Sequence, residues 1–267
     1  MKFKAKFSWL WNYFENLFFK NHSCLVCRRE IPDGTSFSLC KNCFDELEIL
    51  NGNICEICGN KVLDENKICD RCKEFKFNFD KSRSFAVYEE NASKIVKRFK
   101  YSGKKYYAKH IAELMIMRSE CFEDVDFIAF VPIGGKRRKE RGFNQAEELA
   151  REIGKLLNIE VVDALEKIGS ERHQAGLSQK ERQENLSGTF KLKDGFAENL
   201  KGKNILLIDD VFTTGATLSE CSKVLKSDKK NKPNKICCYT FAKTRLNSTN
   251  NGQIQQNNHE EIKTKSN

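Results

Sequence analysis

Four Cys-x-x-Cys pairs constrain the N-terminal part of this 267-residue chain more tightly than any other pattern in its sequence. The first half of the pattern, CLVCRREI…LCKNC, resembles the second, CEICGNKV…ICDRC, so the pairs form an internal repeat. One pair places two thiolates on a tight turn, and two turns supply the four sulfur ligands of a tetrahedral zinc site. We therefore expect a double zinc ribbon over residues 21–75, with two structural Zn²⁺ held by Cys24, Cys27, Cys40, Cys43, Cys55, Cys58, Cys69 and Cys72.

The simplest pairing gives one zinc ion to the first four cysteines and another to the last four, although the spacing also allows an interleaved arrangement. A disulfide framework fits less well, because residues 1–20 contain no small-residue cleavage site of a secretory signal. Four sulfur ligands leave no open coordination position, so both sites should be structural. Few apolar residues surround the turns, so metal binding should supply much of the folding free energy there.

Residues 80–243 alternate short β-branched runs with longer amphipathic stretches. The predicted strands span residues 84–88, 125–131, 205–209 and 236–241, and the predicted helices span residues 93–101, 106–121, 145–157 and 217–226. This alternation predicts an α/β domain with a mostly parallel sheet and helices on both faces. Ligands of such sheets bind at the carboxyl ends of the strands.

One of these strand–helix units, NILLIDDVFTTGAT at residues 204–217, carries a distinctive polar segment. Asp209 and Asp210 end the predicted strand, where paired carboxylates can bind vicinal ribose hydroxyls and favour a divalent cation. The following turn offers backbone N–H groups and hydroxyls to a phosphate at a helix N-terminus, and Gly215 permits close approach. The plainer interpretation, a Thr-capped helix with surface aspartates, fits poorly after four branched apolar residues.

This string resembles the phosphoribosyl pyrophosphate (PRPP) motif of type I phosphoribosyltransferases: an apolar strand, Asp-Asp, two residues and Thr-Thr-Gly-x-Thr. The Gly-Lys-Ser/Thr ending of a Walker A loop is absent. The resemblance implies a site for PRPP with Mg²⁺ at Asp209, Asp210, Val211, Phe212, Thr213, Thr214, Gly215, Ala216 and Thr217.

Two further polar segments, VPIGGKRRKERGFNQ (131–145) and RHQAGLSQKERQENLSGTF (172–190), complete a wider pattern. Together with the cysteine repeat and the PRPP string, they resemble the ComF family, which is associated with natural competence. The resemblance covers about residues 20–243. It implies a double zinc ribbon followed by a type I phosphoribosyltransferase fold, and a role in handling incoming single-stranded DNA in the cytoplasm. It further implies a pyrophosphate loop at Gly134, Gly135, Lys136, Arg137 and Arg138, and a mobile flap carrying Arg172, Lys180 and Arg182.

The sequence leaves open whether PRPP is a substrate or only a ligand. The parts that a phosphoribosyltransferase needs to position PRPP and neutralise pyrophosphate are present. No segment is readable as the recognition element for an acceptor nucleobase. The alternative to a competence role is therefore a genuine phosphoribosyltransferase that acts on an unidentified acceptor.

A second open question is nucleic-acid binding. The net charge of +10 favours anionic partners in general. A basic run interleaved with aromatic residues over 94–107 could track a phosphate backbone and stack bases. The candidates are Lys97, Lys100, Tyr101, Lys104 and Arg141. An equally compatible interpretation is a solvated helix face whose aromatic residues lie in the core.

The two ends of the chain give weaker predictions. Residues 1–20 place apolar side chains at helical spacing, which predicts an amphipathic helix. That helix either packs on the zinc ribbon or lies on the inner face of the cytoplasmic membrane through its lysines. No run of 18 apolar residues occurs, so we expect no membrane-spanning segment. The ComF resemblance implies a cytoplasmic protein, with a competence helicase or channel protein as a candidate partner. Residues 244–267 are predicted to be a disordered polar tail.

Overall fold

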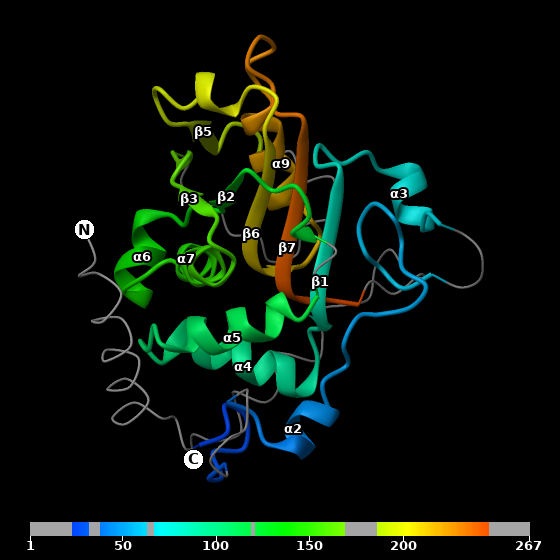
Figure 1. Ribbon diagram of the computed structural model, residues 1–267, viewed down its shortest axis with the longest axis vertical. Helices are drawn as coiled ribbons and strands as arrows, with labels where there is room; N and C mark the ends of the chain where they lie inside the picture. The colour runs from blue at the N-terminus through cyan, green and yellow to red at the C-terminus, as the bar shows by residue number, and fades with distance from the viewer. Residues whose placement is uncertain (1–22, 32–37, 63–66, 119–120, 169–185, 246–267) are drawn as a thin grey trace, which may run out of the picture.

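Strand β6 (Asn204–Phe212) forms the centre of a five-stranded parallel sheet in the computed structural model, which describes residues 23–31, 38–62, 67–118, 121–168 and 186–245 (Figure 1). The strands follow the order β1-β7-β6-β2-β3. The other four are β1 (Lys81–Val87), β2 (Phe127–Phe130), β3 (Glu160–Val162) and β7 (Lys235–Lys243). Residues 205–208 of β6 are at most 1% exposed, as expected for a strand covered on both faces.

Helices cover both faces of this sheet. Tyr239 in β7 donates a hydrogen bond of 2.7 Å to the carbonyl of Met115, in helix α5 (Tyr107–Ile116). The preceding residue, Cys238, lies 3.9 Å from Ser222 of helix α9 (Ala216–Leu225), measured between Sγ and Oγ. Successive side chains of a strand point to opposite faces, so α5 and α9 lie on opposite sides. Helices α4 (Glu90–Tyr101) and α7 (Gln145–Leu157) lie on the side of α5 (Figure 1). The predicted α/β class is confirmed.

Helix α7 has the predicted boundaries, because its ends carry strong signals. The Asn144 side chain accepts a hydrogen bond from the N–H of Ala146 at the first turn, and Asn158 ends the helix in a left-handed conformation.

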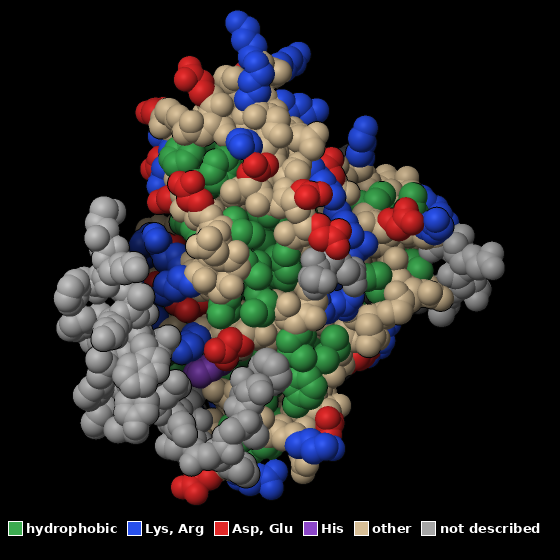
Figure 2. Space-filling view, in the orientation of Figure 1, with side chains coloured by type: hydrophobic (Ala, Val, Ile, Leu, Met, Phe, Trp, Pro, Cys, Tyr) green, Lys and Arg blue, Asp and Glu red, His purple; other side chains and the backbone are tan. Residues whose placement is uncertain are grey.

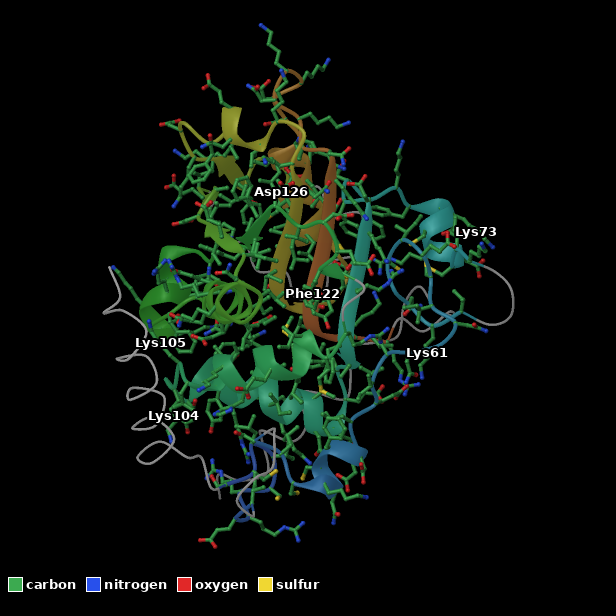
Figure 3. The ribbon with its side chains drawn as sticks, in the orientation of Figure 1. Lys61, Lys73, Lys104, Lys105, Phe122 and Asp126 are labelled. Carbon is green, nitrogen blue, oxygen red and sulfur yellow. The ribbon has the colours of Figure 1, made fainter. Side chains whose placement is uncertain are left out.

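On the sheet side of α5, Phe122 packs edge-on against Tyr239, with ring centroids 5.4 Å apart (Figure 3).

Several predictions of individual elements are wrong. The helix predicted over 106–121 ends at Ile116, and β6 continues through the paired aspartates to Phe212 instead of ending at Asp209. Residues predicted as a loop after β2 form helix α6 (Gly135–Arg141), because Lys and Arg favour helices and Gly142 supplies a left-handed C-cap. Elements without a sequence prediction are helices α2 (Lys41–Asp45) and α3 (Asp70–Glu74), the 3₁₀ turn η2 (Glu198–Leu200), the edge strand β3, and the antiparallel strands β4 (Leu165–Lys167) and β5 (Phe190–Leu192).

The eight cysteines form two groups of four, in the simplest pairing. Within each group the ligand sulfurs lie within 4.8 Å of one another. The Sγ atoms of Cys27 and Cys40 are 3.7 Å apart, as are those of Cys58 and Cys69. A tetrahedron with Zn–S bonds of about 2.3 Å has edges of about 3.8 Å, so both groups fit a zinc ion and are consistent with zinc ribbons. A disulfide requires a far shorter separation, about 2.05 Å.

The ribbon contributes to the core of the α/β part, contrary to the expectation that it has few apolar residues to bury. Leu25, Val26, Ile31, Leu39 and Leu47 are all buried and belong to one continuous hydrophobic cluster with the sheet and its helices. The chain between the two halves of the ribbon also pairs with the outer edge of β1. There the Leu50 N–H donates to the Phe85 carbonyl at 2.9 Å, and the Val87 N–H donates to the Glu48 carbonyl at 2.8 Å.

Several predictions fall outside the described residues: the amphipathic helix at 1–20, the flap residues Arg172, Lys180 and Arg182, and the tail from residue 246 onward. Among the helices that are described, none combines the length and apolar character needed to cross a membrane.

Close packing of α7 on β3 gives a test of the fold. A Cβ added at Gly154 would lie 2.4 Å from Val161 Cγ2 and 2.8 Å from the Ile159 carbonyl oxygen. Helix propensity alone predicts that Gly154→Ala gains about 1 kcal/mol. We expect the clash to prevail, with a net loss of about 1–3 kcal/mol in the free energy of unfolding measured by urea denaturation.

The matched control is Gly135→Ala in α6, where an added Cβ would meet nothing within 4 Å. It should leave the unfolding midpoint unchanged or slightly raised. Equal effects of the two substitutions would contradict the packing of α7 against β3.

Candidate functional site

The order of the strands creates a crevice at one edge of the sheet. From β2 the chain passes through α7 to β3, and from β6 it passes through α9 to β7. These two crossovers run in opposite directions along the sheet, because β2 and β6 are neighbours while β3 and β7 lie on their outer sides. The loops that leave β2 and β6 therefore diverge to opposite faces and open a crevice between them, the usual ligand position in doubly wound sheets.

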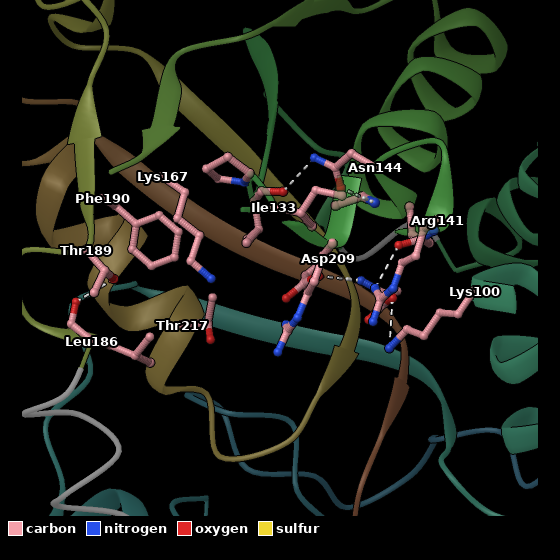
Figure 4. Close-up of a pocket in the computed structure, with 16 residues that line it drawn as sticks. Lys100, Ile133, Arg141, Asn144, Lys167, Leu186, Thr189, Phe190, Asp209 and Thr217 are labelled. Atoms are coloured by element: carbon pink, nitrogen blue, oxygen red, sulfur yellow. Dashed lines mark hydrogen bonds and ion pairs between the residues drawn. The ribbon is translucent and has the colours of Figure 1, made fainter. Parts of the chain in front are cut away.

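A cavity, which we call the sheet-edge cavity, occupies this crevice (Figure 4). Its lining comes from the ends of β2 and β6, from helices α4, α6, α7 and α9, and from the β4–β5 hairpin. The residues are Lys100, Val131, Pro132, Ile133, Arg137, Arg141, Asn144, Gln145, Ala146, Lys167, Leu186, Thr189, Phe190, Asp209, Asp210 and Thr217.

Both aspartates of the predicted site line this cavity. Lys100 of α4 forms an ion pair with Asp210, with Nζ and Oδ2 3.0 Å apart. The Asp209 carboxylate accepts a hydrogen bond of 2.8 Å from the Asp210 N–H. Burial, followed by the adjacent negative charge of Asp210, raises the pKa of Asp209 to about 7. A carboxylate whose pKa is raised in this way is held ready for a cation or a hydrogen-bond donor.

The Thr/Gly turn, residues 213–217, follows directly and leads into α9. Gly215 has φ +72°, and a Cβ there would lie 2.5 Å from Phe212 Cζ, so only glycine fits the position. Thr214 Oγ1 accepts a bond of 3.4 Å from the Ala216 N–H, and Thr217 lines the cavity. The remaining predicted members, Val211 and Phe212, belong to β6, and Phe212 lies in the core.

Helix α6 contains four of the five residues predicted as a pyrophosphate loop, and they do not all face the cavity. Arg137 reaches the cavity, whereas Arg138 pairs with Glu147 of α7 at 3.4 Å. Gly135 and Lys136 are exposed, and Gly134 is the N-cap residue of the helix. Figure 2 shows the Lys and Arg side chains of this region gathered over α6 and the neighbouring end of α5.

The nucleic-acid candidates also separate into two groups. Lys100 and Arg141 line the sheet-edge cavity, and Arg141 donates a bond of 2.9 Å to Gln145 Oε1. Lys97, Tyr101 and Lys104 are exposed at the end of α4 and beyond it. The two groups adjoin, since the Arg141 guanidinium lies 5.8 Å from the centre of the Tyr101 ring.

Several cavity residues were not predicted. Asn144 Nδ2 donates to the Val131 carbonyl at 3.0 Å and so ties the loop after β2 to α7; its N-cap position before an acidic first turn is a readable signal. Lys167 and Phe190 come from the β4–β5 hairpin, with the Lys167 ammonium 5.8 Å from the ring centre of Phe190. A three-residue strand carries no periodicity that could have revealed them.

The chemistry of the cavity suits a polyanion bound with a cation. Among its lining residues are four cations, Lys100, Arg137, Arg141 and Lys167, against the two carboxylates Asp209 and Asp210. The Thr/Gly turn adds backbone donors at the N-terminus of α9. Cations neutralise phosphate charge, and paired carboxylates hold hydroxyl groups or a divalent metal ion.

Comparisons with known proteins extend these observations. A solved adenine phosphoribosyltransferase is matched over 64% of this chain and 84% of its own length, at 15% identity and a TM-score of 0.33. Residues 15–73 match the family model of the double zinc ribbon domain.

Relatives match most of this chain. "Competence protein F" of Haemophilus influenzae is 28% identical over 78% of this chain and 92% of its own length. "Competence protein ComFC" of Bacillus subtilis is 26% identical over 76% and 88%. "DNA utilization protein YhgH" of Escherichia coli K12 is 24% identical over 76% and 89%. With two four-cysteine groups ahead of the parallel sheet, the chain matches a double zinc ribbon domain and is similar over most of its length to proteins named for competence and DNA utilization.

Proposed function

We propose that this protein binds PRPP with Mg²⁺ in the sheet-edge cavity and assists the handling of single-stranded DNA during natural competence. The observation that carries the PRPP proposal is the convergence of four cations and two carboxylates beside the Thr/Gly turn. PRPP carries a 5′-phosphate, two ribose hydroxyls and a pyrophosphate, and each has a counterpart here. The turn would hold the 5′-phosphate and Asp209 and Asp210 the hydroxyls, with Arg137 and Arg141 near the pyrophosphate.

Mg²⁺ would neutralise the pyrophosphate, and the paired carboxylates fit the preference of this ion for oxygen ligands. Lys100 holds Asp210 by an ion pair, so the second carboxylate stays oriented. Asp209 differs, because it must lose its proton with a pKa near 7 before it can bind a hydroxyl or a metal ion strongly.

The DNA part of the proposal rests on the relatives named for competence and DNA utilization, and on the surface beside the cavity. Tyr101 is 74% exposed and Tyr106 is 46% exposed. The ammonium of Lys104 lies 5.8 Å from the ring centre of Tyr106, and Figure 3 shows Lys104 and Lys105 side by side at this end of α4 and α5. Exposed aromatic rings among cations are suited to stacking bases and tracking a phosphate backbone.

A second candidate function, transfer of phosphoribose to an acceptor, is favoured by the other side of the cavity. In Figure 4, Phe190, Thr189 and Leu186 lie across the cavity from Lys100. A wall containing an aromatic ring and a hydroxyl is suited to a flat heterocycle. In that case PRPP would be a substrate, and the side chains of this wall would select the acceptor.

The PRPP site is tested by titration calorimetry with Mg²⁺·PRPP at several pH values. Asp209 is protonated below its pKa of about 7 and then loses its charge, so affinity should fall with falling pH. We expect binding about tenfold weaker at pH 6 than at pH 8. Asp209→Asn should bind weakly at both pH values and lose the part of the pH dependence that exceeds the titration of PRPP itself.

The matched control for Asp209→Asn is Asp194→Asn, which removes one negative charge from an exposed position outside the cavity lining. It should bind as the wild type does. Equal affinity of wild type and Asp209→Asn at pH 8 would contradict the site.

The DNA surface is tested with labelled single-stranded oligonucleotides at increasing salt. Replacement of Lys97, Tyr101 and Lys104 by Ala removes two cations and a stacking ring, so binding should weaken about tenfold or more. The slope of log affinity against log salt should become shallower by about 1.4. Lys229→Ala with Lys230→Ala removes two exposed cations from the turn between α9 and β7, and an equal loss in that control would contradict a localised surface.

The transferase candidate is tested by incubating the protein with Mg²⁺·PRPP and a panel of nucleobases while pyrophosphate release is followed. The transferase candidate requires pyrophosphate release that depends on one acceptor. This release should be lost in Asp209→Asn. If PRPP binds but no acceptor accelerates release, PRPP acts as a ligand and the transferase candidate fails.

A further inference from the structure

The second cysteine group lies directly against the Thr/Gly turn. Arg71, which precedes Cys72 in helix α3, donates from Nη2 to the carbonyl of Thr214. Its guanidinium lies 5.3 Å from the ring centre of Phe77. That ring in turn lies 3.0 Å from the Cβ position of Gly215. One face of the turn is therefore built by the end of the zinc ribbon and the residues that follow it.

The contact with Thr214 bears on the donors of the turn. A trans peptide unit is planar, and its carbonyl and the next N–H point in opposite directions. The carbonyl of Thr214 and the N–H of Gly215 belong to one such unit. Because Arg71 holds the carbonyl on the ribbon side, the Gly215 N–H is directed away from the ribbon. A positive charge on the carbonyl also polarises the peptide unit and makes its N–H a stronger donor.

The charges of Arg71 and of the second metal site also link this contact to metal binding. Four thiolates around Zn²⁺ carry a formal charge of −2. Nε and Nη1 of Arg71 are buried and have no hydrogen-bond partner in the described part of the chain. The thiolates of a zinc-loaded second group would therefore supply the countercharge that compensates the guanidinium. Lys243, only 2% exposed, donates to the Cys58 carbonyl at 3.2 Å. Its ammonium lies 3.4 Å from the ring centre of Phe212, just before the turn.

Among the described residues, no hydrogen bond joins the first cysteine group to the turn. Its corresponding arginine contact comes from Arg98 of α4, which donates to the carbonyls of Leu25 and Val26. Both contacts join an arginine to backbone carbonyls between the ribbon and the α/β part. Only the contact of Arg71 ends on a residue of the Thr/Gly turn.

We propose that Arg71 is a positioning residue for the Thr/Gly turn, and that metal binding by Cys55, Cys58, Cys69 and Cys72 is energetically coupled to phosphate binding at that turn. The inference rests on the proposed binding of PRPP. Coupling is reciprocal, so a ligand at the turn must alter the metal site to the same extent that the metal site alters ligand affinity.

The experiment uses the full chain loaded with zinc, and compares Arg71→Met with the matched control Arg98→Met. The zinc content of each preparation is measured first, and two zinc ions per chain show that the ribbon is intact. Calorimetry with Mg²⁺·PRPP should give about a tenfold loss of affinity for Arg71→Met. The control should stay within about twofold of wild type, because its contact lies away from the turn.

A spectroscopic measurement separates positioning from general stability. In protein loaded with ¹¹³Cd²⁺, each four-cysteine site should give its own resonance. Addition of Mg²⁺·PRPP should shift the resonance of the second site and leave the first unchanged. The shift should be absent in Arg71→Met and partly restored in Arg71→Lys, which keeps a donor and a positive charge.

The outcomes distinguish this inference from the proposed function. If wild-type protein with two zinc ions binds no PRPP, the proposed function and the inference fail together. If wild type binds PRPP while Arg71→Met binds equally well, or while both arginine variants lose affinity equally, only the inference is overturned. A ligand that shifts both cadmium resonances, or neither, also overturns it.

Discussion

Parallel pairing of β6 between β2 and β7 is the constraint on which the site depends. Parallel neighbours need crossover connections, and right-handed crossovers to opposite sides place α7 and α9 on opposite faces. The crevice between the diverging loops follows from topology alone. The same burial that stabilises β6 desolvates Asp209 at its end and raises its pKa to about 7. Desolvation of Asp209 therefore both prepares the carboxylate for a ligand and lowers the stability of the fold, a combination that is expected at functional sites.

The zinc ribbon acts as part of the α/β domain's framework. Its apolar residues share one core with the sheet, its middle segment pairs with the edge of β1, and Arg71 contacts the Thr/Gly turn. A metal-bound module whose side chains are buried by a neighbouring domain has little freedom to move independently. Two distant parts of the sequence, the ribbon and the segment that follows β6, are thereby joined at the Thr/Gly turn.

Strong local signals made four of the five strands of the sheet and α7 predictable, and they indicated two four-cysteine sites while leaving the pairing of the cysteines open. Periodic apolar runs identify β6 and α7, and four Cys-x-x-Cys pairs fix two metal sites. The role of Lys100 was not predictable, because a basic residue on a helix has no mark that distinguishes an ion pair with Asp210 from contact with nucleic acid. Helix α6 was missed because its Gly-Gly start suggested a loop. Lys167 and Phe190 lie on the short antiparallel strands β4 and β5, whose position only tertiary packing determines.

The place of β7 in the sheet has a consequence for synthesis of the chain. Among the strands of the described residues, this one is the last to emerge from the ribosome, yet it lies between β1 and β6. Lys81 of β1 is synthesised before its partner Cys237. The interval between them is on the order of ten seconds at typical translation rates. During that interval the ribbon can already fold on its metal ions and shield the outer edge of β1 through Glu48 and Leu50. Zinc binding by the ribbon would in this way cover a nascent strand edge that is otherwise open to pairing with another chain.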